Sequence, residues 1–350
     1  MERMYVLEPG STLRKSGRNL RLMKNEALVG EIPLENLEQL VLVGFASLSG
    51  AVLDALVRYR VETVLLTPRG KFRARLLVDE HKHVQRRQAQ YLRLHDPGTA
   101  LAVAGSLVRG KVRNSSRLLA LRGSHFECRE LLQAAAQLKG IADLVSLQTD
   151  LDAVRGLEGH AANLYFKAFP LLVRAPGFSF QGRSKRPPLD PVNALLSFVY
   201  TLLTQEVLTA VKIAGLDPYL GALHAVEYGR PSLACDLVEE WRNFLGDRLV
   251  LGLINRRVIA PDDFVVREVA CTDAVDEEDL KEKRPVEMKP RVARAFIQAY
   301  EKWMETRIRC PRTGEHTDYR GLIRRQVRHF SRFLQGEDEA YEPFTWSRVQ

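Results

Sequence analysis

The spacing of apolar residues changes near Thr99, and this change limits the possible folds more than any other feature of the chain. Before Asp79, short apolar segments are separated by turn signals such as Pro9-Gly10, a pattern that predicts short β-strands. From Thr99 onward, apolar residues recur at helical spacing almost throughout. We therefore expect an α+β fold, in which an N-terminal β-rich domain precedes a larger all-α domain.

The same pattern gives the domain boundaries. Residues 1–78 are expected to form the β-rich domain, with one short helix over 50–58 that Ser49 can cap. Residues 79–98 are polar and basic, so we predict a basic linker there, with room for a helical part. Residues 99–350 then form the helical domain, with helices predicted over 99–122, 126–138, 150–173, 190–215, 232–252, 290–308 and 317–335.

The charge balance favours a polyanionic partner. The 350 residues include 52 Lys and Arg against 43 Asp and Glu, a formal net charge of +9, and the pI is about 9.4. Such a balance is typical of proteins that bind nucleic acid or an anionic membrane surface. No basic helix has the large apolar face that membrane docking requires, and the most apolar stretch, Asn193 to Ala214, is interrupted by charged residues. We therefore expect nucleic acid as the partner and no membrane.

The cysteines bear on the cellular compartment. Cys128, Cys235, Cys271 and Cys310 are far apart and form no CxxC pair, so neither structural zinc nor a disulfide framework is expected. The residues after Met1 do not form a basic-then-apolar signal region. Both features indicate a reducing cytoplasm.

Four side chains of the helical domain form a candidate metal site. Glu158 lies beside the apolar stripe of its predicted helix, where a carboxylate is costly unless it is paired or bound to a metal. His224 follows a turn in an apolar setting, and Asp236 and Glu239 share one face of the next helix. Carboxylates with one imidazole suit Mg²⁺ or Mn²⁺ better than a sulfur-seeking metal.

Structural roles for the same residues remain open at this point. A single histidine in an apolar segment is usually a hydrogen-bonded core residue, and Glu158 can pair with Arg155. Asp236 and Glu239 can also form an exposed acidic helix start that the helix dipole favours. Spacing alone does not decide, because ligands far apart in sequence follow no strict spacing rule.

Basic residues gather over 69–93, at the start of the helical domain, in the loop over 182–186, and in the last helix. In that helix, Arg320, Arg324, Arg328 and Arg332 recur every four residues and can follow a phosphate backbone. Each cluster alone can be a solvated face, but together they favour nucleic acid. The expected DNA contacts are Arg73, Arg86, Arg87, Lys111, Arg113, Arg117, Arg183, Arg186, Arg242, Arg324 and Arg328.

Three polar residues of one predicted helix, and one arginine of a later helix, can have structural rather than functional roles. Asn193, Ser197 and Tyr200 share one helix face, and we expect them to satisfy buried hydrogen bonds. Arg242 lies three residues after Glu239 and can either pair with it or reach a phosphate.

Taken in order, these motifs resemble the CRISPR-associated adaptation integrase family, whose members insert new spacers into CRISPR arrays. The most specific segments are Gly215-Leu-Asp-Pro-Tyr-Leu-Gly followed by His224, and Asp236-Leu-Val-Glu239-Glu-Trp-Arg242. Gly110-Lys111 with Asn114, and the segment Arg186-Pro-Pro-Leu-Asp-Pro, precede them. The resemblance covers nearly the whole chain.

The resemblance implies a metal-dependent DNA integrase and endonuclease. Glu158, His224 and Glu239 would be the catalytic ligands of Mg²⁺ or Mn²⁺, with Asp236 as a supporting carboxylate. Because Asp236, Glu239 and Glu240 lie so close together, the identity of the third ligand stays open.

The resemblance also implies the substrates and the assembly. Double-stranded DNA with 3′-OH ends would be joined to the repeat of a CRISPR array by transesterification, as part of antiviral defence. The β-rich domains would form a homodimer, and a small companion adaptation subunit would bridge two such dimers. Two other functions remain possible, namely a metal-dependent nuclease acting on branched DNA or RNA without integration, and a non-catalytic DNA-bridging scaffold.

Overall fold

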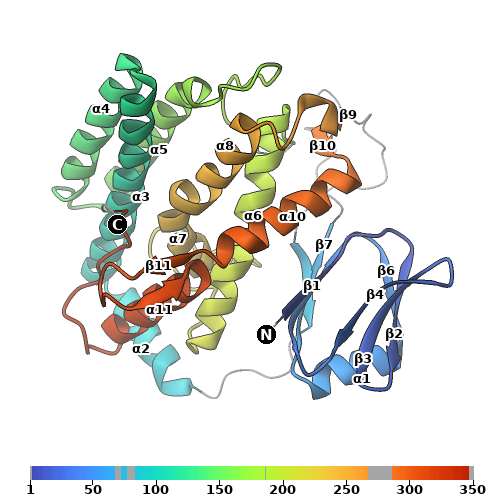
Figure 1. The fold of residues 1–350 in the computed structure, drawn as a ribbon. Helices are drawn as coiled ribbons and strands as arrows, with labels where there is room; N and C mark the ends of the chain where they lie inside the picture. The colour runs from blue at the N-terminus through green and yellow to red at the C-terminus, as the bar shows by residue number, and fades with distance from the viewer. Residues whose placement is uncertain (1, 68–71, 77–82, 186, 267–285, 347–350) are drawn as a thin grey trace. The chain divides into compact units, whose positions relative to one another are not determined.

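The computed structural model describes residues 2–67, 72–76, 83–185, 187–266 and 286–346. The chain forms two compact units. Met1–Glu80 and Lys289–Phe296 belong to the first unit, and His81–Met288 and Ile297–Gln350 belong to the second. A β-rich N-terminal region is thus followed by a larger helical region, as predicted (Figure 1).

The first unit contains two four-stranded sheets. Its elements are β1 (Glu2–Val6), β2 (Ser11–Ser16), β3 (Asn19–Lys24), β4 (Ala27–Pro33), β5 (Leu37–Val43), β6 (Ala46–Leu48), α1 (Gly50–Arg58), β7 (Glu62–Leu66) and β8 (Phe72–Leu76). One sheet has the order β1-β5-β7-β8, with β8 antiparallel to β7 and the other pairs parallel. The other sheet has the order β4-β3-β2-β6, in which β2 and β6 are parallel.

One apolar core joins these elements. Leu13 of β2, Leu40 of β5, and Val52 and Leu56 of α1 are all fully buried in it. Burial of each such side chain contributes about 1.5–3 kcal/mol relative to exposure. The predicted cap of α1 is confirmed, because the Ser49 hydroxyl accepts a hydrogen bond from the backbone N–H of Val52 at 3.3 Å.

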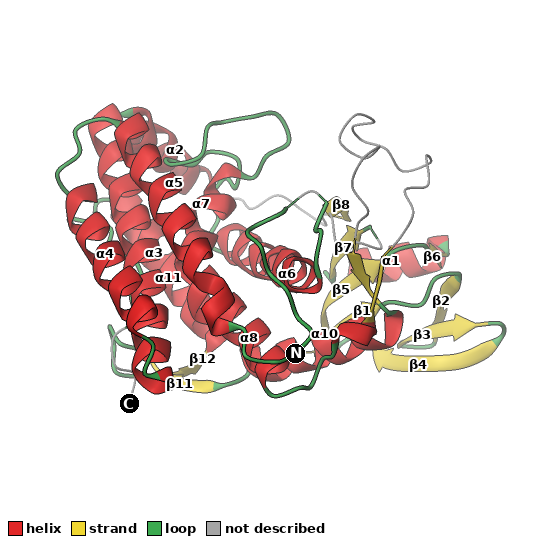
Figure 2. Ribbon diagram, turned by 90° about the horizontal axis from the view of Figure 1, so that it is seen from above, coloured by secondary structure: helices red, strands yellow, loops and turns green. Residues whose placement is uncertain are grey.

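The second unit is mainly helical. Its helices are α2 (Val84–His95), α3 (Pro97–Phe126), α4 (Arg129–Val145), α5 (Leu151–Ala168), α6 (Pro191–Ile213), α7 (Ser232–Trp241) and α8 (Arg248–Asn255), followed by α10 (Pro290–Met304), which begins in the first unit, and α11 (Tyr319–Leu334). Short 3₁₀ turns cover η1 (Phe169–Leu172) and η3 (Pro261–Asp263), and a π-helical turn, η2 (Arg242–Asp247), joins α7 to α8. Helices α3, α4 and α5 lie side by side (Figure 2).

The helical region contains more than the helices that were predicted. Two short hairpins occur there, β9 (Phe264–Val266) with β10 (Val286–Met288), and β11 (Arg307–Arg309) with β12 (His316–Asp318). Strands of three residues are too short to show an alternating pattern, so periodicity did not reveal them. The helix expected over 126–138 instead covers Arg129–Val145, because α3 continues to Phe126 and Glu127 then adopts a left-handed conformation with φ of 53°.

The basic segment between the two regions contains a packed helix. In α2, Gln90 is fully buried and donates hydrogen bonds to the carbonyls of Asp217 and Leu220, at 2.8 and 2.9 Å. Leu94 is buried as well. The polar composition of 79–98 obscured this packing, because only these two side chains of α2 are buried.

Helix α6 is the core helix of the second unit. Among the described helices it is the one long and apolar enough to cross a membrane by length and composition, yet 83% of its most apolar window is buried inside the protein. Val192, Leu195 and Val207 are fully buried. The helix predicted over 190–215 is confirmed.

Candidate active site

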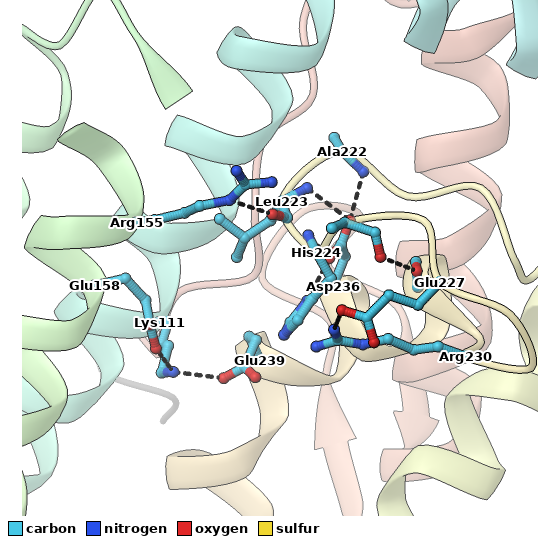
Figure 3. Close-up of polar contacts among 12 residues, drawn as sticks. Lys111, Arg155, Glu158, Ala222, Leu223, His224, Glu227, Arg230, Asp236 and Glu239 are labelled. Atoms are coloured by element: carbon cyan, nitrogen blue, oxygen red, sulfur yellow. Dashed lines mark hydrogen bonds and ion pairs between the residues drawn. The ribbon is translucent and has the colours of Figure 1, made fainter. Parts of the chain in front are cut away.

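Helices α3, α5 and α7 and the loop between α6 and α7 carry the candidate site (Figure 3). Lys111 lies on α3, Glu158 on α5, His224 on the loop, and Asp236 and Glu239 on α7. Figure 3 shows Lys111 between Glu158 and Glu239, with Asp236 directed at the loop that holds His224. Residues far apart in sequence therefore meet through the packing of α3 against α5 and α7.

Asp236 fixes the loop that carries His224. Its completely buried carboxylate accepts the backbone N–H groups of Ala222 and Leu223 on Oδ2, at 2.6 and 3.0 Å. Its Oδ1 accepts the N–H of His224 at 2.9 Å and lies 2.6 Å from Nδ1 of the same residue. A side chain at Gly221 would collide with this carboxylate, so the turn requires glycine. The imidazole is thereby oriented through Nδ1, and Nε2 remains as the nitrogen for a ligand.

Arg155 supports the same loop. Its Nε donates a hydrogen bond to the carbonyl of Leu223 at 2.9 Å, and its guanidinium pairs with Asp152 at 3.0 Å. The sequence allowed an ion pair between Arg155 and Glu158, but the arginine has these other partners instead. Glu158 is left for Lys111.

Lys111 links the two glutamates across the site. Its ammonium is ion-paired with Oε1 of Glu158 and lies 2.7 Å from Oε2 of Glu239. Arg242 approaches the other oxygen of Glu239, Oε1, at 3.1 Å, so one of the two alternatives predicted for this arginine is observed. Lys111 was predicted to contact DNA, but here its ammonium faces carboxylates, and only 16% of its side chain is exposed.

The charges around Glu239 keep it ionised. Burial alone would raise the pKa of its carboxyl group, but the positive charges of Arg242 and Lys111 outweigh burial and lower the pKa to about 2. The alternative of an exposed acidic helix start is wrong, because Asp236 is 0% and Glu239 only 4% exposed. A buried carboxylate that stays ionised needs a positive partner and therefore attracts a cation strongly.

Glu240, the neighbour of Glu239, has a different role. It accepts hydrogen bonds from the Tyr341 hydroxyl and, at 2.6 Å, from the backbone N–H of Phe344. Burial raises the pKa of its carboxyl group to about 8. Of the three neighbouring acids on α7, Glu239 is therefore the one that is paired, together with Glu158, to the Lys111 ammonium. Glu240 instead anchors the C-terminal segment that contains Tyr341 and Phe344.

The side chains that could hold a divalent cation are those of Glu158, Glu239 and His224, and the Lys111 ammonium lies between the two glutamates. Within the described parts of the chain, no three His, Cys, Asp or Glu side chains converge closely enough to hold a metal ion as they stand. Oε2 of Glu239 is nevertheless buried, and its one partner among the described residues is the Lys111 ammonium at 2.7 Å. Together with the Glu158 carboxylate and Nε2 of His224, this oxygen forms a donor set that suits Mg²⁺ or Mn²⁺.

Another buried carboxylate, that of Asp247, lies at the end of η2. The hydroxyls of Tyr165 and Tyr200 each donate to it at 2.6 Å, and the Asn243 side chain donates at 2.9 Å. The guanidinium of Arg242 lies over the Tyr200 ring, 4.8 Å from its centroid. This cluster fixes the turn that presents Arg242. The sequence analysis did not predict this cluster, the contact of Arg155 with the Leu223 carbonyl or the anchoring role of Glu240. No local pattern marks a partner that is distant in the sequence.

The polar face of α6 has the structural role expected of it. Arg183 donates hydrogen bonds to Oδ1 of Asn193 at 2.7 Å and to Oγ of Ser197 at 3.0 Å. Tyr200 bonds to Asp247. The guanidinium of Arg183, predicted to contact DNA, is therefore engaged within the protein.

The other residues predicted to contact DNA differ in their surroundings. Arg86 donates to the carbonyl of Ala214 at 2.9 Å, and Arg113 is exposed and lies 3.5 Å from Asp143. Arg73, in the first unit, lies 4.8 Å from the centroid of the Phe45 ring. Half-buried side chains are found at Arg87, Arg117 and Arg324, and Arg186 lies outside the described residues.

The arginine stripe of α11 is not uniform. Arg320 pairs with Glu206 and Glu301, at 3.2 and 2.6 Å, so it stabilises helix packing rather than facing solvent. Arg332 pairs with Asp338 at 3.1 Å. Arg328 is exposed. Of these three, Arg328 is thus the one best placed to reach a phosphate.

The sequence matches the family model described as CRISPR associated protein Cas1 over residues 4–302. A CRISPR-associated endonuclease Cas1 from Thermus thermophilus is 38% identical over 344 residues, which cover 97% of this chain and 96% of that relative. Another from Chlorobaculum tepidum is 34% identical over 349 residues and covers 98% of both chains.

Solved structures share the fold. A casposase bound to an integration product has a TM-score of 0.82 at 20% identity, with 100% of this chain and 96% of that chain covered. A chain of a Cas6-RT-Cas1–Cas2 complex has the same TM-score and identity, and the match covers 100% of this chain and 36% of that one. Because the family model and the relatives cover nearly the full length, the chain belongs to the CRISPR-associated Cas1 family.

Proposed function

We propose that the protein is a metal-dependent DNA endonuclease and integrase of CRISPR adaptation. The observation that carries this proposal is the pair of carboxylates, Glu158 and Glu239, held by one cation beside an imidazole whose orientation Asp236 fixes. The family membership supports it, since the relatives from Thermus thermophilus and Chlorobaculum tepidum are named CRISPR-associated endonucleases.

Mg²⁺ or Mn²⁺ would be held by Glu158, Glu239 and Nε2 of His224. When bound, such an ion polarises the scissile phosphate and stabilises the departing oxygen. Asp236 is better suited to orienting His224 than to binding the ion, because both of its oxygens are occupied by the loop. In the proposal it is therefore a positioning residue.

The reaction exchanges one phosphodiester for another. The 3′-OH oxygen of the incoming DNA forms a bond to the phosphorus of the repeat DNA, and the bond from that phosphorus to its 3′ oxygen breaks. The proton of the attacking hydroxyl goes to solvent, and the departing oxygen takes one up. No ATP is needed, since the number of phosphodiester bonds is unchanged. Arg242, fixed by Glu239 and Tyr200, can neutralise charge that develops on the phosphate.

The partners and compartment follow from the same proposal. The substrates are double-stranded DNA with 3′-OH ends and the CRISPR repeat. The similar fold of a chain in a Cas6-RT-Cas1–Cas2 complex supports a companion subunit. In the proposal this subunit is small and bridges two homodimers. We place the protein in the cytoplasm, where its DNA substrates are found.

An integration assay tests the proposal. Purified protein is incubated with Mn²⁺, labelled DNA ending in 3′-OH groups and a supercoiled plasmid carrying a repeat, with and without the companion subunit. We expect labelled DNA to join the plasmid, and His224→Ala to abolish joining. The matched control is His160→Ala, which replaces an exposed histidine on α5. This variant should join the labelled DNA normally. Normal joining by His224→Ala would refute the assignment.

The same assay separates the two other functions. A nuclease without integration activity would cleave branched DNA or RNA in Mn²⁺ but would not join the labelled strand. A non-catalytic scaffold would bind DNA but would neither cleave it nor join it. Its Glu158→Gln variant would bind DNA with the affinity of the wild type.

A further inference from the structure

We propose that Lys111 is a built-in counter-ion of the metal site, which holds Glu158 and Glu239 together without metal and must move away when a divalent cation binds. The inference rests on the proposed function. It assigns to Lys111 a role as a positioning residue, distinct from the predicted DNA contact.

The position of the ammonium is that expected for a bound cation. Nζ of Lys111 is ion-paired with Glu158 and lies 2.7 Å from Oε2 of Glu239, a buried oxygen with no other partner among the described residues. A Mg²⁺ ion lies about 2.1 Å from its carboxylate oxygens. The ion and the ammonium therefore cannot occupy the space between the two carboxylates together.

The negative charges of Glu158 and Glu239 explain why a cation is needed between these carboxylates even without metal. Glu158 and Glu239 come from different helices, and their side chains are only 29% and 5% exposed. Two carboxylates facing each other with so little solvent repel strongly unless a positive charge lies between them. Lys111 supplies that charge before metal arrives.

Lys111, rather than Arg242, is the cation that can leave. The Arg242 guanidinium is held between Glu239 and the Tyr200 ring, and it contacts the opposite oxygen of the glutamate, Oε1. The lysine ammonium is a point charge on a flexible four-carbon stem, so it can move without a change in the backbone. Its side chain retains a path to solvent, since 16% of it is exposed.

The test compares Mn²⁺ binding and thermal stability of the full-length, metal-stripped protein without DNA. Lys111→Met removes the charge and keeps the length of the side chain. Lys167→Met, at an exposed lysine of α5, is the matched control. We expect Lys111→Met to have a lower Tm than wild type in EDTA, and to bind Mn²⁺ more tightly by about tenfold or more in calorimetry, because the competing cation is gone.

The outcomes separate this inference from the proposed function. If wild type binds Mn²⁺ and Glu158→Gln does not, but Lys111→Met binds no more tightly than wild type, the counter-ion role is wrong and the metal site stands. If wild type binds no Mn²⁺, the proposed metal dependence fails, and the counter-ion inference fails with it.

A second measurement avoids the variant and therefore does not depend on its folding. Wild-type protein is treated briefly with an amine-acylating reagent, with and without Mn²⁺, and the modification of each lysine is measured by mass spectrometry. Mn²⁺ should increase acylation of Lys111 and leave that of Lys167 unchanged. Equal acylation of Lys111 in both conditions, at Mn²⁺ concentrations that saturate the protein, would overturn the inference.

Discussion

Replacement of Asp236 by asparagine should damage the site through the loop that carries His224. The two carboxylate oxygens accept three backbone N–H groups, those of Ala222, Leu223 and His224, and also contact the His224 ring. An asparagine has one acceptor oxygen and one amide group that only donates. With Nδ1 of His224 carrying a hydrogen, as metal binding through Nε2 requires, two of the four donors lose their acceptor whichever way the amide is turned.

The size of the effect follows from this count. A hydrogen bond to a charged group is worth about 1.5–3 kcal/mol, so losing two at a fully buried position should cost about 3 kcal/mol or more. The corresponding fall in Tm is roughly 6–12 °C. Because the imidazole also loses the partner that orients it, we expect Mn²⁺ affinity to fall by about 10–100-fold in the folded protein.

Thermal unfolding and Mn²⁺ titration of Asp236→Asn check this prediction, with Asp143→Asn as the control. Asp143 is an exposed aspartate whose only described ion pair, with Arg113 at 3.5 Å, is worth little. The control should behave as wild type in both measurements. If Asp236→Asn also kept the Tm and Mn²⁺ affinity of wild type, the reasoning about the loop would be refuted.

Three further outcomes are expected. Because the pKa of Glu240 is raised to about 8 in the folded protein, unfolding free energy should decrease as pH rises from about 5 to 8, and Glu240→Gln should flatten that slope in denaturant titrations. Mn²⁺ at 100 times its Kd should stabilise the wild type by about 2.7 kcal/mol and leave Glu158→Gln unchanged, as differential scanning fluorimetry would show. DNA affinity should fall steeply with salt, and Arg328→Gln should reduce the slope of log K against log salt by about 1; an unchanged slope would exclude a phosphate contact there.

The sequence was sufficient where a feature depends on local periodicity or on a single turn. The structure confirms three such local features. They are the helical spacing of apolar residues in α6, the cap at Ser49 and the β-rich start of the chain. A difference that local patterns could not show is at η2, where the helix expected over 232–252 contains a π-helical turn. That turn is stabilised by Asp247, whose tyrosine partners lie on α5 and α6, so no local pattern could reveal it.

The polar partners in the site could not be predicted from the sequence for a related reason. Glu239 and Glu240 are adjacent, and successive residues of a helix point about 100° apart, so one faces Lys111 and the other faces Tyr341. Their chemistry is the same, and only the neighbouring segments, α3 for Glu239 and the residues after α11 for Glu240, distinguish them. Lys111 looked like one member of a basic cluster because its carboxylate partners are supplied by α5 and α7.

Anomalous diffraction from Mn²⁺-soaked crystals of the wild-type protein tests the central claim most directly. The account predicts one manganese peak bounded by Glu158, Glu239 and Nε2 of His224, with the Lys111 ammonium displaced from its position between the two carboxylates. A structure without manganese at this place, in crystals soaked well above the Mn²⁺ concentration that supports strand joining, with Lys111 still bound to both glutamates, would contradict it.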